Sequence, residues 1–344
     1  MIVGTYKNLL ETSASIAKRF HVSDSHAHEV FDRYVKLDRL PLTDAISVDE
    51  VFLDMDDNCK YALVIQDFHT GDPIDLLRSR RATVTEPYFV SIPTEERSAV
   101  KYLISDMYNQ YISYVDKYFP NAVAVIDSFH VIQWITRMID NYIRQLIRKL
   151  RQRDRELQER LSYGQGQPVP LPLSAKVYLL QKFRWLVLAS QSNIRYHADP
   201  RMDSHFHALI NTYDYENALF RIDPDLKDYR DLKELYIQFN SRNSGKPLEA
   251  RNELSGLIRK YRKSEHEMFR DFASLLAKYE DPIINSFITV EKIGNGKIYD
   301  SRLSNGPIES INRKVKDLKR LGRGFLNFEH FRNRFLYAAR SAPY

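Results

Sequence analysis

Three short runs near the start of the chain alternate apolar and polar residues in the way that β-strands do. They are Ala45–Met55, Lys60–Phe68 and Pro73–Arg78. The segments between them are rich in Asp, Asn, Gly and His, which is typical of tight turns. Because both connections are short, the pattern predicts a β-meander of two hairpins.

Two further apolar runs carry an aspartate at or near their ends, and a helical pattern follows each. Ala99–Met107 precedes a predicted helix over 109–119, and Ala122–Asp127 precedes a long one over 129–161. Such runs are typical of strands buried on both faces. With an irregular helix over 85–100, the order of elements predicts an α/β protein with an RNase H-like fold: a mixed sheet with helices on both faces.

Helical patterns dominate the part of the chain that follows. A linker rich in Gly and Pro is predicted over 162–173, and a strand is predicted only later, over 284–298. Five helices are predicted between them: Ala175–Ala189, Ser204–Phe220, Leu226–Phe239, Leu248–Tyr261 and His266–Tyr279. We therefore expect a large all-α insertion between the sheet and a last group of helices.

The first 35 residues predict two short helices joined by a turn. Ile16 and Phe20 share one helical face, and a second helix follows His21, with Ser23 or Asp24 as its N-cap. This is typical of a DNA-binding helix-turn-helix. His21 stands where such motifs usually have glycine, so an ordinary helical hairpin is the alternative. The predicted domains are the helix-turn-helix (1–40), the first part of the core (41–142), the helical insertion (143–298) and the C-terminal helices of the core (299–344).

Composition narrows the class of protein. The 344 residues contain 51 Lys and Arg against 45 Asp and Glu, a small excess whose clustering matters more than its sum. The single cysteine, Cys59, excludes a disulfide framework and a Cys-rich zinc site within the chain. There is no apolar run of the roughly 18 residues that a membrane span needs, and no signal-peptide pattern. We expect a soluble cytoplasmic protein that does not act at a membrane.

Three acidic residues stand where a metal site would need them. Asp49 lies inside the first predicted strand, Asp106 ends the fourth, and Glu309 opens a late basic helix. The first and fourth strands are neighbours in an RNase H-like sheet, so the two aspartates would meet and a helix packed beside them would add the glutamate. Convergent carboxylates suit hard cations, and two such ions suit phosphoryl transfer. The pattern predicts a two-ion site for Mg²⁺ or Mn²⁺, although Asp106 is alternatively a strand-end cap.

An Asp-x-x-His pair, Asp127 and His130, follows the fifth predicted strand. At the same sheet edge as Asp106, the pair would brace the acidic site or bind a substrate phosphate. Asp127 is alternatively a helix N-cap, and His130 a buried histidine at a helix start.

Basic residues gather in two places. Those of the predicted helix-turn-helix are Lys18, Arg19, His26 and Arg33, and those that follow Glu309 are Arg313, Lys314, Lys316, Lys319, Arg320 and Arg323. Clustered Lys and Arg side chains bind DNA phosphates. The sequence therefore predicts double-stranded DNA as the partner.

Four motifs in this order resemble a known family. They are S-V-D-E at Asp49, L-I-S-D-M-Y-x-x-Y-I at Asp106, V-I-D-S-F-H-V-I at Asp127, and S-N-G-P-I-E-S-I-N-R-K-V-K-x-L-K-R-x-G-x-G-F-x-N-F-x-x-F-R-x-R at Glu309. The set is similar to the DDE transposases of the ISL3 insertion-sequence family. The resemblance runs from about Asp44 to the C-terminus and includes the helix-turn-helix before it. The last motif is long and specific, whereas the others are short.

The resemblance implies a bacterial transposase that cuts DNA at the ends of an insertion sequence and transfers the strand to target DNA. It implies Asp49, Asp106 and Glu309 as catalytic acids that hold two Mg²⁺ or Mn²⁺ ions, with Asp127 and His130 in support. Asp127 as the second acid is an alternative that some readings of the family would favour. It also implies a homo-oligomer on element ends and target DNA, associated with the bacterial nucleoid.

One departure from the family concerns the N-terminus. Members usually begin with a Cys/His zinc-binding segment, whereas this sequence has no cysteine before Cys59. It resembles a truncated copy, so the alternative function is a non-catalytic DNA-binding repressor derived from a transposase. A different RNase H-like nuclease is disfavoured by the late basic motif and the helical insertion.

Overall fold

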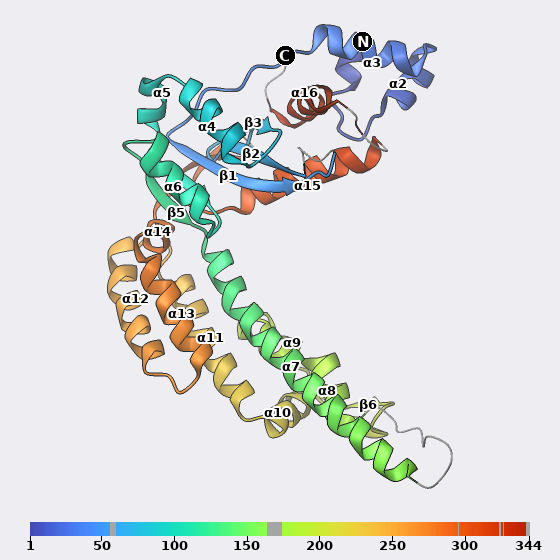
Figure 1. The fold of residues 1–344 in the computed structure, drawn as a ribbon, viewed down its shortest axis with the longest axis vertical. Coiled ribbons are helices and arrows are strands. Elements are labelled where there is room, and N and C mark those ends of the chain that lie inside the picture. The colour runs from blue at the N-terminus through green and yellow to red at the C-terminus, as the bar shows by residue number, and fades with distance from the viewer. Residues whose placement is uncertain (56–59, 164–173, 295, 323–324, 326, 342–344) are drawn as a thin grey trace. The chain divides into compact units, whose positions relative to one another are not determined.

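The computed structural model describes residues 1–55, 60–163, 174–294, 296–322, 325 and 327–341. The chain divides into two compact units (Figure 1). The first unit contains residues 1–128, 244–247 and 279–344, and the second contains residues 129–243 and 248–278. The linker predicted over 162–173 lies almost entirely outside the described residues. Of the described helices, none has the length and apolar character that a membrane crossing would need.

The first unit is built on a five-stranded mixed sheet in the order β3-β2-β1-β4-β5. The pairs β1–β2 and β2–β3 are antiparallel, and the pairs β1–β4 and β4–β5 are parallel. The strands are β1 (Ala45–Phe52), β2 (Tyr61–Asp67), β3 (Pro73–Leu77), β4 (Tyr102–Ser105) and β5 (Val123–Ile126). The predicted meander, the mixed sheet and the adjacency of the first and fourth strands are confirmed.

Alternation along β1 sends its side chains to two faces, and helices cover both. Ile46 and Val48 share a buried cluster with residues of α4 (Ala82–Ser91), which α5 (Thr94–Ala99) follows, and of α6 (Asn109–Tyr118). Val51 packs on the opposite face with α15 (Gly306–Leu321) and α16 (Phe328–Ala339). The two-residue period of a strand therefore places Asp49 on the α15 side and Glu50 on the α6 side.

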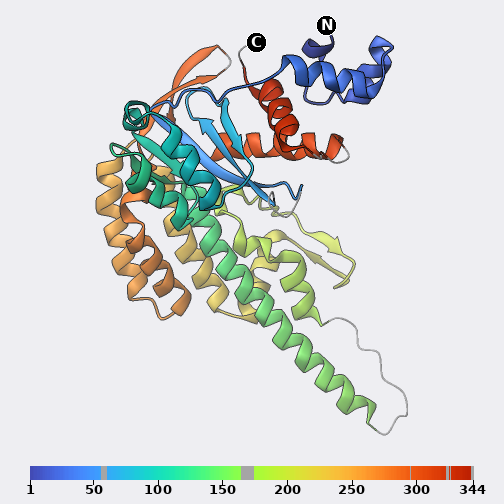
Figure 2. The same cartoon turned by 45° about the horizontal axis from the view of Figure 1, so that its top comes forward.

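Three short helices precede the sheet: α1 (Ile2–Thr5), α2 (Ser13–Phe20) and α3 (Asp24–Tyr34). Their buried residues share a cluster with Tyr337 of α16, and Figure 2 shows these blue helices near the red C-terminal ones. His21 ends α2 in the left-handed conformation, at φ 54°. Ser23 caps α3 by accepting the His26 N–H at 3.1 Å. The two predicted helices and their turn are confirmed.

A hairpin of β8 (Thr289–Gly294) and β9 (Lys297–Arg302) also belongs to the first unit. The strand predicted over 284–298 begins too early, because residues 284 and 285 still belong to α14 (Glu280–Asn285). The Ile293 N–H donates to the His69 carbonyl in the β2–β3 turn at 2.8 Å. The hairpin thereby groups with the sheet, although most of it lies within the range predicted for the insertion.

The second unit consists mainly of helices. Its helical segments are α7 (Ser128–Ser162), α8 (Ala175–Phe183), α9 (Trp185–Leu188), a 3₁₀ turn (Gln191–Asn193), α10 (Thr212–Ile222), α11 (Asp225–Arg242), α12 (Pro247–Arg262) and α13 (Glu267–Lys278). The first residues of α7 and α12 belong to the first unit. The long helix predicted over 129–161 is confirmed. The helix predicted over 175–189 is divided at Arg184.

The prediction of an all-α insertion is wrong over residues 201–210. A small hairpin of β6 (Arg201–Asp203) and β7 (Ala208–Ile210) replaces the first half of the helix predicted over 204–220. Asp203 Oδ1 accepts the N–H groups of His205 and Phe206, at 2.7 and 3.1 Å. His207 is left-handed, at φ 48°. This turn chemistry outweighs the helical pattern of the apolar residues.

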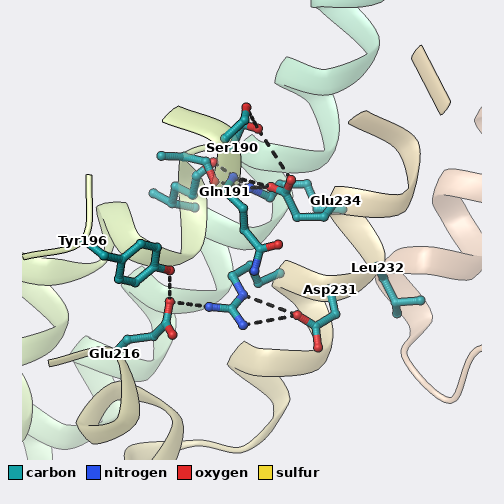
Figure 3. A network of polar contacts seen from close by, with 12 residues as sticks. Ser190, Gln191, Tyr196, Glu216, Asp231, Leu232 and Glu234 are labelled. Atoms are coloured by element: carbon teal, nitrogen blue, oxygen red, sulfur yellow. Dashed lines mark hydrogen bonds and ion pairs between the residues drawn. The ribbon is translucent and has the colours of Figure 1, made fainter. Parts of the chain in front are cut away.

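Charged side chains of α11 fix the segment that follows α9 (Figure 3). Arg230 pairs with Glu216, which also accepts the Tyr196 hydroxyl. Glu234 accepts the Gln191 N–H at 3.2 Å, and Lys233 Nζ donates to the Leu188 and Ala189 carbonyls at 3.0 and 2.6 Å. Because Lys233 is fully buried, these bonds offset the cost of removing its charge from water.

Candidate active site

Asp49 of β1 lies beside Asp106, which directly follows the neighbouring parallel strand β4. Ser47 of β1 pairs with Ile104 of β4, and continuing this register by two residues places Asp49 level with Asp106, just past the end of β4. Both carboxylates are partly exposed. The sheet thus brings together two acids that are 57 residues apart in the sequence.

Glu309 comes from the first turn of α15, which packs on the same face. The buried side chains Ile308, Ile311, Val315 and Leu318 hold this helix against the sheet. Asn305 is its N-cap and Pro307 lies in its first turn, so the predicted helix start is confirmed. Glu309 follows a buried residue and is itself partly exposed, which leaves its carboxylate accessible to a ligand.

The electrostatics of Asp49 report on this proximity. Burial, and next the negative charge of Asp106, raise the pKa of Asp49 to about 7, with further contributions from Glu50 and Glu309. A negative charge that raises the pKa of Asp49 must lie close enough to repel its carboxylate. A bound cation would relieve that repulsion.

Asn312 is a residue of this site that the sequence did not reveal. Its Nδ2 donates to Asp49 Oδ2 at 2.8 Å, one turn along α15 from Glu309. Its Oδ1 is buried and has no hydrogen-bond partner among the described residues. The signals in the sequence are its place in the Glu309 motif and its spacing of three from Glu309, which puts both side chains on one side of a helix.

Asp127 lies in the same unit and is almost fully buried. Its Oδ2 accepts the Asn305 N–H at 2.8 Å, and its own N–H contacts the Ser105 carbonyl at 3.3 Å. Asp127 therefore links the end of β5 to β4 and to the start of the helix that carries Glu309. His130 belongs to the second unit, on α7.

The acidic trio offers the hard oxygen ligands that Mg²⁺ and Mn²⁺ prefer. The unpartnered Oδ1 of Asn312 adds an acceptor suited to a metal-bound water. The ligands of a two-ion site bracket ions about 4 Å apart, so they need not converge on one point. The residues present therefore fit a divalent metal.

Two groups of His and Asp among the described residues, neither of which includes an acid of the trio, have ligand atoms within 4.8 Å of one another. They are His28, Asp32 and His330 in the first unit, and Asp225, Asp228 and His266 in the second. The rings of His28 and His330 are stacked, with centroids 3.7 Å apart and planes at 19°. Nearly parallel rings direct their lone pairs in parallel rather than to one point, so this group suits hydrogen bonding to Asp32 better than metal binding.

The basic residues predicted to bind DNA are mostly exposed. Lys18, Arg19, His26 and Arg33 are exposed on α2 and α3, and Arg313, Lys314, Lys316 and Arg320 are exposed on α15, where Lys319 is half-buried. Arg19 is paired with Glu11, and Arg320 with Asp317 at 3.5 Å. Arg323 lies outside the described residues.

A comparison with known protein families identifies the family of the chain that carries these acids and this basic helix. A family model described as a transposase, that of the ISL3 family, matches residues 46–335, which is more than half of the chain. The chain belongs to the ISL3 transposase family. Proteins of such families act on DNA, and the match covers all three acids. No curated protein and no solved structure matches the chain.

Proposed function

We propose that this transposase uses Asp49, Asp106 and Glu309 to cut DNA at the ends of an insertion sequence and to join those ends to target DNA. In this proposal the sheet is the core of an RNase H-like DDE domain. The observation that carries it is the register of β1 with β4, which sets Asp49 beside Asp106 on the face that α15 covers.

Each residue of the site has a proposed task. Asp49, Asp106 and Glu309 would hold two Mg²⁺ or Mn²⁺ ions. When bound, such ions supply an activated water and stabilise the attacking and leaving oxygens of phosphoryl transfer. Asn312 would orient Asp49. Asp127 would hold the start of α15 in position through its bond to the Asn305 N–H.

DNA binding is assigned to the two basic surfaces. Arg313, Lys314 and Lys316 would contact phosphates beside the acids, and α3 would act as the recognition helix with Arg33 and His26 exposed on it. Removal of one phosphate contact lowers the salt dependence of binding by about one unit of slope. The second unit would serve as the insertion domain, and we expect self-association on paired ends.

The test is metal-dependent cleavage and strand transfer on the element's own end. We expect Asp49→Asn, Asp106→Asn and Glu309→Gln each to abolish both reactions while end binding persists. The matched control is Asp300→Asn, an exposed acid on β9, which should cut like the wild type. Retained cleavage in any of the three variants would remove that residue from the site.

The alternative function is a DNA-binding repressor without catalysis. Wild-type protein that binds the end but neither cuts nor transfers it in Mg²⁺ or Mn²⁺ would favour this alternative. Nicking without strand transfer would instead indicate a nuclease.

A further inference from the structure

A row of exposed aromatic and cationic side chains lies at the end of the sheet nearest to the proposed site. Phe52 and Tyr61 pair across β1 and β2, with ring centroids 5.2 Å apart. The Arg80 guanidinium lies 4.7 Å from the Tyr61 ring centroid and 5.3 Å from that of Tyr108. We call Phe52, Tyr61, Arg80 and Tyr108 the aromatic row.

Both ends of the aromatic row connect to residues of the proposed site. The Tyr108 N–H donates to Asp106 Oδ1 at 3.0 Å. At the other end, Lys319 Nζ of the basic helix α15 lies 5.7 Å from the Phe52 ring centroid. The aromatic row thus joins a predicted phosphate-binding helix to a predicted catalytic acid.

Arg80 is held in place within the row. Its Nη1 pairs with Glu50 Oε1 at 2.7 Å, and the Tyr111 hydroxyl donates to the other oxygen of Glu50 at 2.7 Å. With its charge already paired, Arg80 offers mainly its flat face, which stacks on rings as aromatic groups do. The guanidinium is therefore an oriented part of the platform.

The side chains of the row are not core residues. Phe52, Tyr61 and Tyr108 are 48%, 39% and 38% exposed. A cross-strand aromatic pair at a strand end is a common stabilising feature and would account for Phe52 and Tyr61. It does not account for Tyr108, which comes from the loop after β4 and extends the row toward Asp106.

We infer that the aromatic row binds unpaired nucleotides of DNA, next to the phosphodiester that the acids cut. Proteins that bind single strands combine cations for the backbone with aromatic side chains on which bases stack. Phe52 lies three residues beyond Asp49 at the end of β1, about 10 Å along the strand and on the opposite face of the sheet. A DNA strand that passes around this end of the sheet can therefore reach both. The inference rests on the proposed function in one respect: the proposed function specifies that the bound nucleotides are those beside the cleaved phosphodiester.

The test is binding of the full chain, in EDTA, to fluorescein-labelled oligo(dT) of about 20 nucleotides, long enough to cover a typical single-strand site. We expect Tyr61→Ala and Tyr108→Ala each to weaken binding, measured by fluorescence anisotropy, about tenfold. Tyr61→Phe keeps the ring and should bind like the wild type. The control Tyr299→Ala removes a tyrosine of similar exposure from β9 and should have no effect.

Two results would overturn the inference: no binding of oligo(dT) by the wild type, or wild-type affinity in both alanine variants with circular dichroism unchanged. A change in self-association without a change in oligo(dT) affinity would make the row a protein contact instead, and would also overturn it. Cleavage of the element's end is measured separately. A wild type that binds oligo(dT) through the aromatic row but never cuts DNA would refute the proposed function. The inference that the aromatic row binds unpaired nucleotides would still hold.

Discussion

At the scale of single residues, Asn312 is placed to orient Asp49, which we propose as a metal ligand. It donates to Asp49 Oδ2 at 2.8 Å, and partners of this kind fix the orientation of a ligating carboxylate. We expect Asn312→Ala to weaken Mn²⁺ binding about tenfold, as measured by isothermal titration calorimetry. Ser310→Ala, exposed on the same helix, is the control. Equal Mn²⁺ affinity in both variants would show that Asn312 does not position Asp49.

Asp49 also predicts a pH dependence of stability in the metal-free protein. Burial and the charge of Asp106 raise its pKa to about 7, above the roughly 3.9 of an unfolded chain. The folded state therefore binds more protons between these values, so stability falls as pH rises from about 4 to 7. We expect Asp49→Asn to stabilise the protein by about 1–2 kcal/mol at pH 8, because partial exposure screens part of the repulsion, and by almost nothing at pH 4.

Thermal unfolding in EDTA at the two pH values measures this difference. Saturating Mn²⁺ at pH 8 should reverse the order of the wild type and Asp49→Asn, because only the wild type keeps its full set of ligands. An Asp49→Asn variant that gains no stability at pH 8 would mean that the three carboxylates do not repel one another.

The three acids could be predicted from the sequence, but the residues that position them could not. Asp49 lies inside a strand, Asp106 at the end of one and Glu309 at a helix start, and such positions can be recognised from the sequence pattern. The bonds of Asn312 to Asp49 and of Asp127 to Asn305 join positions 263 and 178 residues apart. Such contacts depend on how α15 packs on the sheet, and no local pattern encodes that.

At the scale of elements, the placement of α15 decides whether Glu309 reaches the aspartates. Asp127 accepts the Asn305 N–H at its start, and an asparagine side chain in its place would keep an oxygen acceptor there. We expect Asp127→Asn to fold and to retain much of the cleavage activity, and Asp127→Ala to lose about 1–3 kcal/mol of stability because the buried N–H loses its partner. Chemical denaturation and the cleavage assay measure the two effects.

Asp106→Asn provides the comparison for Asp127→Asn. It should fold normally and lose cleavage, because Asp106 is assigned to the metal. If Asp127→Asn is inactive and Asp106→Asn is active, the second acid is Asp127, and the assignment based on the β1–β4 register is wrong.

The elements themselves differ in how well the sequence predicts them. Short apolar runs predicted the five strands of the sheet, and a helical period predicted α7. The bounds agree within a few residues, because burial on one or both faces requires those patterns. The β6–β7 hairpin was missed, since it depends on the Asp203 side chain and the left-handed His207. Short strands with exposed residues such as Met202 and Leu209 carry little pattern to detect.

At the scale of the whole molecule, each of the two units has its own buried groups, and this permits a test of their independence. Both tryptophans, Trp134 and Trp185, lie in the second unit, so tryptophan fluorescence reports on its unfolding. The proposed metal site lies entirely in the first unit. Mn²⁺ affinity and tryptophan fluorescence therefore follow different parts of the chain.

Lys233 is the residue with which to separate the two units. Its buried ammonium bonds two carbonyls and lies 3.0 Å from Glu234 Oε1, so Lys233→Met leaves a buried carboxylate without its cation. We expect a loss of about 3–5 kcal/mol of stability, seen as a lower urea midpoint in tryptophan fluorescence, with Mn²⁺ affinity unchanged below that midpoint. Lys227→Met breaks an exposed pair with Asp231. It should lower the free energy of unfolding by less than about 0.5 kcal/mol. A parallel fall in Mn²⁺ affinity in Lys233→Met would instead mean that the two units do not unfold independently.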